Sequence, residues 1–188
     1  MSGAEPTDGG DRADDRRAQP GRRRVFFALW PDDATRSALV RATKGAVRLC
    51  GGRPIAKERL HVTVAFLGEV TAEQLASVRG AAPVAVGAFD LTLDLLGVWP
   101  QSRVLWLAGR DVPDALNALE RELWTRLEQR GFKREERIYR PHLTLARRAR
   151  PVEEEVPPVT WPVTELALVE SIPDGRNVHY EVLERWPL

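Results

Sequence analysis

The sequence predicts an α+β fold, built from helices and antiparallel strands that form one ordered body over residues 23–188. One observation is the order of the segments, which we interpret as β-α-β-α-β-β-α-β-β-β; this mixture favours α+β architecture over a doubly wound parallel sheet. A second is a short pattern that occurs twice, 81 residues apart, and indicates two copies of one structural unit. The third is the composition, with 43% hydrophobic and 29% charged residues, which is typical of a packed globular domain.

The first ordered elements are a strand and a helix. Residues 24–30 form an apolar run that predicts the strand. Pro31 and Asp32 then open a helix that we expect to continue to about residue 49, because proline is favoured at helix starts and the following pair of glycines ends the segment.

A second strand, a short helix and a pair of strands follow. Residues 59–67 form the strand, and Thr71 with Gln74 makes a capping box at the start of the short helix. Further strands are predicted near 88–98 and 102–108, paired through the Pro-Gln turn between them.

The last part of the chain contains the clearest helix and three strands. Leucine and tryptophan residues fall on one face at helical spacing over residues 113–130, and Gly131 is placed to cap the C-terminus of this helix. Strands are then predicted near 139–147, 160–171 and 177–186. The last two of these are joined by a Pro-Asp-Gly turn.

The N-terminal residues 1–22 differ from the rest of the chain. They hold Gly, Pro, Asp and Arg, with only methionine and alanine among apolar residues. Such a segment cannot bury enough surface to offset the entropy of ordering, so we expect a disordered tail. A basic arm that tethers RNA is the alternative, but the carboxylates in the segment cancel much of its positive charge.

Charge and cysteine content narrow the classes of protein. The chain has 28 Lys and Arg against 27 Asp and Glu, whereas proteins that coat long nucleic acids usually carry a large basic excess. An RNA ligand would therefore be a short end rather than a long duplex. The single cysteine, Cys50, excludes an internal disulfide and fits a cytoplasmic location. No run of 18 apolar residues occurs, so we expect no membrane span, and we predict a monomer.

The repeated pattern places histidine and threonine together on two strands. Arg-x-His-apolar-Thr-apolar-Ala occurs at residues 59–65 and 140–146. Because side chains alternate across a strand, His61 and Thr63 point to one face while the residues between them point to a core. The same holds for His142 and Thr144. If the two copies face each other, a cleft contains two imidazoles and two hydroxyls with approximate two-fold symmetry.

This set of residues suits the hydrolysis of a phosphodiester. A neutral imidazole can take a proton from water while a protonated one gives a proton to the leaving oxygen, and histidine, with an ordinary pKa of about 6.5, supplies both forms near neutrality. Such proton transfer contributes roughly 10²–10⁴ in rate. Threonine hydroxyls can donate to the non-bridging oxygens, which gain charge in the transition state. We therefore predict His61 and His142 as catalytic residues and Thr63 and Thr144 as substrate-binding residues.

Two arginines, Arg103 and Arg147, are further candidates for binding the phosphate. Arg147 lies five residues after His142, so strand alternation turns it to the other face unless a bulge or the strand end intervenes. Among the tryptophans, Trp30 and Trp99 lie at strand ends and remain candidates for stacking on bases.

No metal or cofactor is predicted. The sequence has no His-Glu-x-x-His, no Cys-x-x-Cys and no acidic residue inside either copy of the pattern. It also lacks a Gly-x-x-x-x-Gly-Lys-Ser/Thr loop, so we do not expect an ATP-driven ligase. The third histidine, His179, is interpreted as an ordinary strand residue.

The sequences HVTV (61–64) and HLTL (142–145) resemble the paired His-x-Thr-x motifs of the 2H phosphoesterase superfamily. Longer stretches, LHVTVAFLGEV (60–70) and YEVLERWPL (180–188) among them, resemble its bacterial RNA 2′,3′-cyclic phosphodiesterases, historically called 2′-5′ RNA ligases. The resemblance covers residues 23–188. It implies two α+β lobes related by a pseudo-two-fold axis, with the motifs facing across a central cleft.

The resemblance also implies residue roles and a reaction. His61 would be the general acid and His142 the general base, with Thr63 and Thr144 holding the phosphate. The implied activity is metal-free hydrolysis of a 2′,3′-cyclic phosphate, on RNA 3′ ends or short oligonucleotides, to a 2′-phosphate. Action on another cyclic nucleotide and 2′-5′ joining of RNA remain alternatives. A non-catalytic RNA-end binding module is a third, although a binder would not need two proton-transfer groups.

Overall fold

The computed structural model describes residues 21–82, 84–175 and 177–188. Over this part of the chain the α+β prediction is confirmed. The elements in order are β1 (Arg23–Leu29), α1 (Asp33–Leu49), β2 (Arg53–Pro54), η1 (Lys57–Arg59), β3 (Val62–Val70), α2 (Ala72–Arg79), β4 (Phe89–Leu93), β5 (Leu95–Trp99), β6 (Val104–Ala108), α3 (Asp114–Glu128), β7 (Leu143–Arg147), β8 (Val159–Val163), β9 (Glu165–Asp174) and β10 (Asn177–Pro187). The tail predicted for residues 1–22 lies outside the described residues except for its last two.

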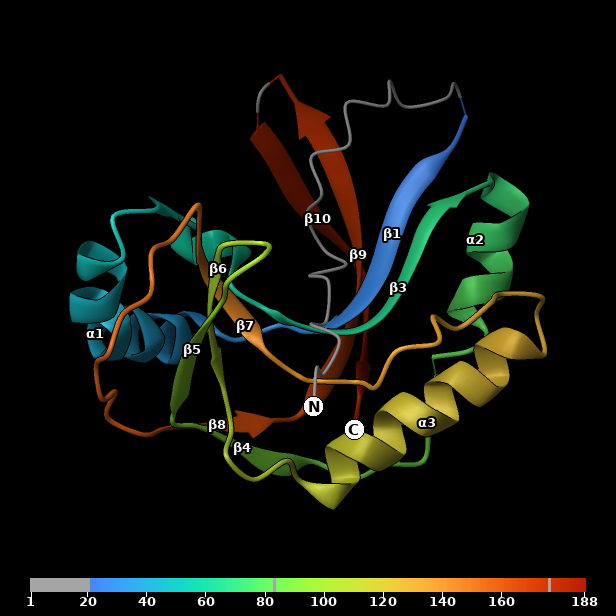
Figure 1. The fold of residues 1–188 in the computed structure, drawn as a ribbon. Coiled ribbons are helices and arrows are strands. Elements are labelled where there is room, and N and C mark those ends of the chain that lie inside the picture. Colours follow the sequence, from blue (N-terminus) through green and yellow to red (C-terminus); the bar gives the residue numbers. More distant parts are fainter. Residues whose placement is uncertain (1–20, 83, 176) are drawn as a thin grey trace.

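Most of the strands form one antiparallel sheet (Figure 1). Its order is β10-β9-β1-β3-β7-β6-β5, and β2 pairs with β7 beside this path. β4 and β8 form a separate two-stranded sheet. The protein is therefore a large sheet with helices and a small sheet packed against it.

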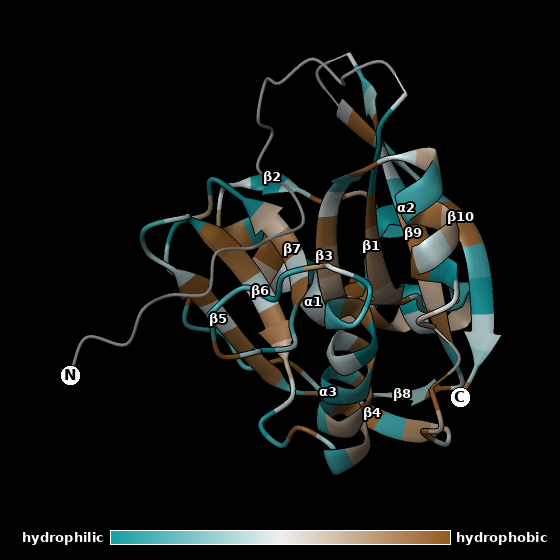
Figure 2. Cartoon of the chain, turned by 90° about the vertical axis from the view of Figure 1, so that its right-hand side faces the viewer, coloured by the Kyte–Doolittle hydropathy of each residue, from teal (hydrophilic) through white to brown (hydrophobic). Residues whose placement is uncertain are grey.

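One face of the large sheet is covered by the three helices and the small sheet. Leu39 of α1, Leu75 of α2 and Leu123 of α3 belong to the same buried cluster as Phe27 of β1 and Leu143 of β7. Each helix thus packs an apolar side onto the sheet, while hydrophilic residues appear on the outer side of α3 (Figure 2). The polar residues of the repeated motifs lie on the opposite face of the sheet.

Local sequence signals determine where the helices begin. Asp32 accepts a hydrogen bond from the backbone N–H of Thr35 at 2.7 Å and caps α1. This bond to the ionised carboxylate holds the pKa of Asp32 below its ordinary value. Thr71 and Gln74 form the predicted capping box of α2, with both of its hydrogen bonds present.

Two predicted strands are each divided in two, so their prediction as continuous strands is wrong. The stretch 88–98 breaks at Asp94 into β4 and β5, and the stretch 160–171 breaks at Thr164 into β8 and β9. β4 and β8 pair with each other, whereas β5 and β9 continue into the large sheet. The breaks depend on partners distant in sequence, which local residue preferences do not reveal.

The two motif strands meet at one pair of residues. Within the described chain, β3 and β7 are paired through Val62 and Leu143, both of which face the core. Away from this joint, β3 continues beside β1, and β7 continues beside β6 and β2 (Figure 1). The two halves of the sheet are thus joined at the repeated pattern. Two separate pseudo-symmetric lobes stay a prediction.

Candidate active site

The joint between β3 and β7 brings the two copies of the motif together. Val62 lies opposite Leu143 in an antiparallel register. Continuing this register by one residue places His61 opposite Thr144 and Thr63 opposite His142. Directly opposed residues have Cβ atoms about 4.5–5.5 Å apart. Each histidine therefore lies beside the threonine of the other copy, on the face of the sheet away from the helices.

The approximate two-fold symmetry of the motifs follows from this pairing. An antiparallel pair of strands is locally symmetric about an axis through its central residue pair. The copies are adjacent strands of one sheet, with Val62 and Leu143 at the symmetry point. Antiparallel pairing alone thus makes the surroundings of the two histidines similar to a first approximation.

Both imidazole rings are held in the same way. Nδ1 of His61 lies 2.7 Å from the carbonyl oxygen of Arg59, and Nδ1 of His142 lies 2.8 Å from that of Arg140. A carbonyl oxygen only accepts, so Nδ1 carries the proton in each ring. The neutral ring then has its lone pair on Nε2, which is the nitrogen that can take or give a proton during a reaction.

The aromatic surroundings of the two histidines differ. The ring of His61 contacts Phe26 with centroids 5.0 Å apart, stacks on Trp30 at 5.5 Å and 22°, and meets Tyr180 edge-on at 5.3 Å. The ring of His142 contacts Trp99 at 4.5 Å and 81°. His61 is therefore enclosed by aromatic rings to a greater extent.

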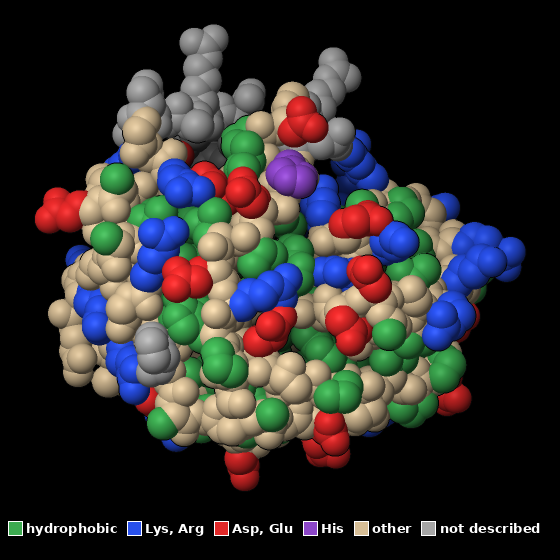
Figure 3. Space-filling model, turned by 180° about the vertical axis from the view of Figure 1, so that it is seen from behind, with side chains coloured by type: hydrophobic (Ala, Val, Ile, Leu, Met, Phe, Trp, Pro, Cys, Tyr) green, Lys and Arg blue, Asp and Glu red, His purple; other side chains and the backbone are tan. Residues whose placement is uncertain are grey.

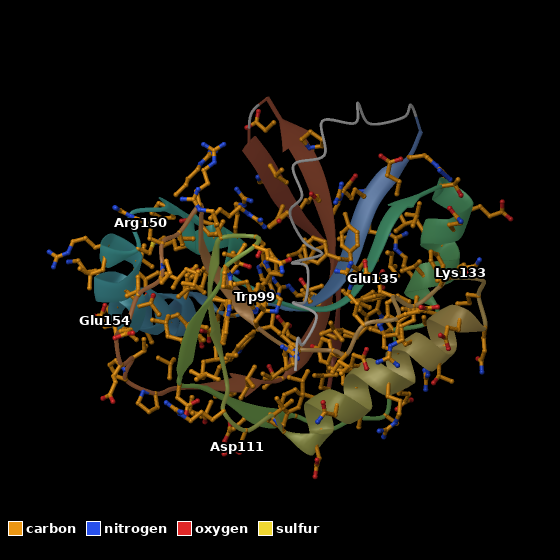
Figure 4. All side chains as sticks on the ribbon, viewed as in Figure 1. Trp99, Asp111, Lys133, Glu135, Arg150 and Glu154 are labelled. Atoms are coloured by element: carbon orange, nitrogen blue, oxygen red, sulfur yellow. The ribbon has the colours of Figure 1, made fainter. Side chains whose placement is uncertain are left out.

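The two tryptophans considered for base stacking support the histidines instead. Trp30 and Trp99 are only 8% and 7% exposed, which leaves little ring surface for a base. Trp99 lies at the end of β5, near the middle of the face shown in Figure 4. The sequence prediction does not include Phe26 and Tyr180. Alternation along β1, which puts Phe26 on the same face as Trp30, is the signal that could have found Phe26.

A bulge in β7 turns Arg147 toward the histidine face. Trp106 of β6 pairs with Thr144 and Leu105 pairs with Ala146, so Leu145 is an extra residue in β7. Leu145 and Ala146 both lie in the main core, and Arg147 then returns to the side of Thr144. A bulge is one condition under which strand alternation lets Arg147 reach the site, and β7 contains one.

The first motif strand has a bulge at the equivalent place. Ala28 of β1 pairs with Thr63 and Phe27 pairs with Ala65, so Val64 is the extra residue. Phe66, which corresponds to Arg147, lies on the face of the histidines within the cluster around Phe26 and Trp30. The guanidinium of Arg24 lies over the Phe66 ring at 5.0 Å.

Arg103 fastens the turn between β5 and β6 to the end of β7. Its backbone has a φ of 54°. Its guanidinium donates to the carbonyl oxygens of Arg148 and Ala149 at 3.1 and 3.5 Å, and its own carbonyl accepts from the N–H of Ala149 at 2.9 Å. The structure thus gives Arg103 a part in holding the backbone. Its contact with a phosphate stays a prediction.

A pocket lies beside His142, between β3, α3 and the segment that precedes β7. Thr63 and His142 line it. The hydroxyl of Tyr139 donates to the carbonyl of Thr63 at 3.1 Å and ties the two motifs together; burial raises the pKa of this hydroxyl. Glu120 is 4% exposed and pairs with Arg134 at 2.7 Å. Burial raises the pKa of Glu120, although Arg134 acts in the opposite direction.

Within the described residues, a metal-binding group, a membrane-spanning helix and the third histidine were each a possible further feature of function. No group of three or more His, Cys, Asp and Glu side chains that could hold a metal ion occurs among residues 21–82, 84–175 and 177–188. In these same ranges, no helix is both long and apolar enough to span a membrane. His179 is exposed next to Tyr180 in β10, so it points to the face opposite His61. Seen from behind, basic and acidic side chains are interspersed (Figure 3).

Comparison with known proteins identifies first a fold class and then a family. The fold is that of an α+β class that includes LigT from E. coli: its crystal structure with 3′-AMP matches with a TM-score of 0.79 and 34% identity, covering 89% of this chain and 98% of that one. A family model described as the 2′-5′ RNA ligase superfamily matches residues 31–175. The chain belongs to the 2′-5′ RNA ligase superfamily.

Two curated relatives extend this result. A protein of E. coli K12 named RNA 2′,3′-cyclic phosphodiesterase is 36% identical over 171 residues, which are 88% of this chain and 96% of the relative. A protein of the same name from Thermus thermophilus is 31% identical over 185 residues, 88% of this chain and 90% of the relative. The resemblance seen in the sequence is confirmed at the level of the family.

Proposed function

We propose that this protein hydrolyses 2′,3′-cyclic phosphates at RNA 3′ ends to 2′-phosphates. The observation that carries the proposal is the matched pair of imidazoles at the β3–β7 joint, each with Nδ1 bonded to a backbone carbonyl, at 2.7 and 2.8 Å. The names of the relatives in E. coli and T. thermophilus support the substrate class. The crystal structure of LigT with 3′-AMP supports a site for a ribose phosphate.

In the proposed reaction, water attacks the phosphorus atom and the bond to the ribose 3′ oxygen breaks. Nε2 of His142 accepts a proton from the attacking water. Nε2 of His61 donates its proton to the departing 3′ oxygen, so the product has a 2′-phosphate and a 3′-hydroxyl. The two rings exchange protonation states in one turnover and are reset by exchange with solvent.

The rings around His61 support its role as the acid. A cation is attracted to the face of an aromatic ring, and Trp30 stacks on His61 with an angle of 22° between the planes. An imidazolium at His61 would gain this attraction, which would offset part of the hydration that it loses among the aromatic rings. The family resemblance gives the same assignment.

Thr63, Thr144 and Arg147 bind the phosphate in this proposal. The hydroxyls donate to non-bridging oxygens, and a guanidinium can offer two parallel N–H groups to a phosphate. The bulge in β7 supports Arg147 in this role, because it returns the residue to the histidine face. A contact from Arg103 requires its guanidinium to leave the two carbonyl oxygens that it now bonds.

The test is turnover of a ribodinucleotide that ends in a 2′,3′-cyclic phosphate. His61→Asn and His142→Asn should each lower the rate by roughly 10²–10⁴, the contribution of positioned proton transfer. His179→Asn is the matched control, because it changes the same residue type on the opposite face, and it should leave the rate unchanged. Phosphorus NMR should show a 2′-phosphate. Absence of turnover by the wild type, or a mixture of 2′- and 3′-phosphates, would contradict the proposal.

The family also suggests a joining reaction at the same site. If the 5′-hydroxyl of a second RNA takes the place of water, the same proton transfers form a 2′-5′ phosphodiester and release the 3′ oxygen. The cyclic phosphate is consumed, so no nucleotide cofactor is needed. Adding a 5′-hydroxyl oligonucleotide to the assay should then yield a joined product that an RNase specific for 3′-5′ linkages does not cleave.

We further infer a cytoplasmic monomer that acts on short RNA ends without metal. The formal charge of +1 and the single cysteine, Cys50, which is buried, support this view. Light scattering of the purified protein tests the oligomeric state. Assay with a free cyclic mononucleotide tests the alternative substrate class.

A further inference from the structure

Arg53 lies on the same face of the sheet as the histidines. It belongs to the two-residue strand β2 and pairs with Arg147, while Pro54 pairs with Ala146. Directly opposed residues of an antiparallel pair share a face. Ala146 faces the core and Arg147 faces the site, so Arg53 projects beside Arg147. Arg53 is exposed to solvent.

The backbone around β2 is held against β7 on both sides. Before β2, the carbonyl of Cys50 accepts from the N–H of Arg150 at 2.9 Å; after it, the N–H of Ile55 donates to the carbonyl of Leu145 at 2.8 Å. Between them, a Cβ atom at Gly52 would lie only 2.5 Å from a carbonyl oxygen at the end of β7. Backbone hydrogen bonds thus hold both ends of β2 against β7, and the close approach at position 52 is possible because glycine has no Cβ atom.

Two arginines in opposed positions have the chemistry of an anion site. Like charges directly opposite each other on two strands are unfavourable by themselves. Two successive phosphate groups of an RNA, one bound by each guanidinium, offset this repulsion with charge-assisted hydrogen bonds, and the planar guanidinium matches phosphate geometry. The other residue of β2, Pro54, has no N–H to add to the sheet. The strand therefore contributes mainly the placement of Arg53.

The arginine pair lies farther along β7 than the histidines. Arg147 is three residues beyond Thr144, which is about 10 Å of extended strand. The long side chain of Arg147 can reach back toward a phosphate at Thr144. Arg53, on the neighbouring strand, can then reach a second phosphate of the same RNA.

We propose that Arg53 binds the phosphodiester immediately upstream of the cyclic phosphate, while Arg147 binds the cyclic phosphate itself. This inference rests on the proposed function and narrows its substrate class to RNA that carries at least one upstream phosphodiester. It makes a free cyclic mononucleotide a poorer substrate than a cyclic-ended dinucleotide.

The experiment compares two ribodinucleotides that both end in a 2′,3′-cyclic phosphate. One has an ordinary phosphodiester between its nucleosides, and the other has an uncharged methylphosphonate there. The wild type should prefer the charged linkage in kcat/KM by about tenfold or more, the effect of one charged hydrogen bond. Arg53→Met should turn over the methylphosphonate as the wild type does, within about twofold, and should lose the preference. Arg53→Lys should keep part of it.

The control is Arg41→Met, which removes an exposed arginine from α1 on the helix-covered side and should retain the wild-type preference. With the charged dinucleotide, the slope of log KM against log salt should fall by about 0.7 in Arg53→Met, the value for one contact to a single strand. An unchanged linkage preference in Arg53→Met, or an equal loss on both dinucleotides, would overturn the inference. A wild type that cleaves neither dinucleotide would instead contradict the proposed function.

Discussion

Gly97→Ala should damage the support of His142 from a distance. Gly97 of β5 lies directly opposite Trp106 of β6, whose indole covers it. A Cβ atom at position 97 would lie 2.2 Å from Cζ2 of Trp106 and 2.7 Å from Cε2 and Cη2. The indole must therefore move. It contacts Trp99 at 5.5 Å, and Trp99 contacts His142 at 4.5 Å, so the displacement leads directly to the imidazole.

The expected loss of stability in Gly97→Ala follows from the cost of forcing an extra atom into a packed region. Such overpacking costs about 1–3 kcal/mol, and for a domain of this size each kcal/mol lowers the Tm by about 2–4 °C. A protein that stays folded at 25 °C would retain full activity if only stability changed. We expect Gly97→Ala to lose turnover even at 25 °C, where it stays folded, because the Trp99 ring that supports His142 shifts.

Thermal unfolding, near-ultraviolet circular dichroism of the tryptophans and dinucleotide hydrolysis are the measurements. Gly87→Ala is the matched control, since a Cβ atom there would have no neighbour within 4 Å. Adding Trp106→Phe to Gly97→Ala should restore part of the loss, because phenylalanine lacks the second ring of the indole. Wild-type stability and turnover in Gly97→Ala, or no rescue in the double variant, would refute this reasoning.

Four further outcomes are expected. The double variant His61→Asn/His142→Asn should be scarcely slower than either single variant, because groups that act in one step are not additive; rates that multiply would show independent action. Asp32→Ala should cost about 1 kcal/mol of stability at neutral pH through loss of the helix cap. Asp32→Asn keeps a cap but cannot ionise. Because the pKa of Asp32 is lowered in the folded state, the wild type should be more stable than this variant above the ordinary pKa of 3.8, and this difference in stability should be lost as pH falls below that value. Denaturant unfolding at a series of pH values measures it. Activity should survive EDTA, and loss with rescue by a divalent ion would contradict the metal-free reaction.

The features that the sequence predicted well are those with local causes. The N-cap at Asp32 and the capping box at Thr71 depend on residues three positions away, and both are present as expected. The outward direction of His61 and Thr63 depends only on strand alternation. The repeat indicated that the two motifs face each other, but their direct pairing as neighbouring strands of one sheet was not predicted.

What the sequence could not provide depends on partners distant in the chain. Phe26 reaches His61 from β1, the neighbour of β3, and Tyr180 reaches it from β10, which is separated from β1 by β9; both places are decided by the whole sheet. The breaks within 88–98 and 160–171 have the same cause. Arg53 was missed because a strand of two residues, one of them a proline, has no periodic pattern to detect.

The paired bulges change how the motif should be read in related sequences. A regular strand has a period of two, so a residue five positions after the histidine would face the core. One extra residue reverses which positions of the strand face the core. In the sequence this reversal corresponds to two successive core residues, Val64-Ala65 in one copy and Leu145-Ala146 in the other. In a relative that keeps such a pair, the next position should face the substrate. Variation there, as between Phe66 and Arg147 within this one chain, would then change the residues on the histidine face rather than the core beneath the helices.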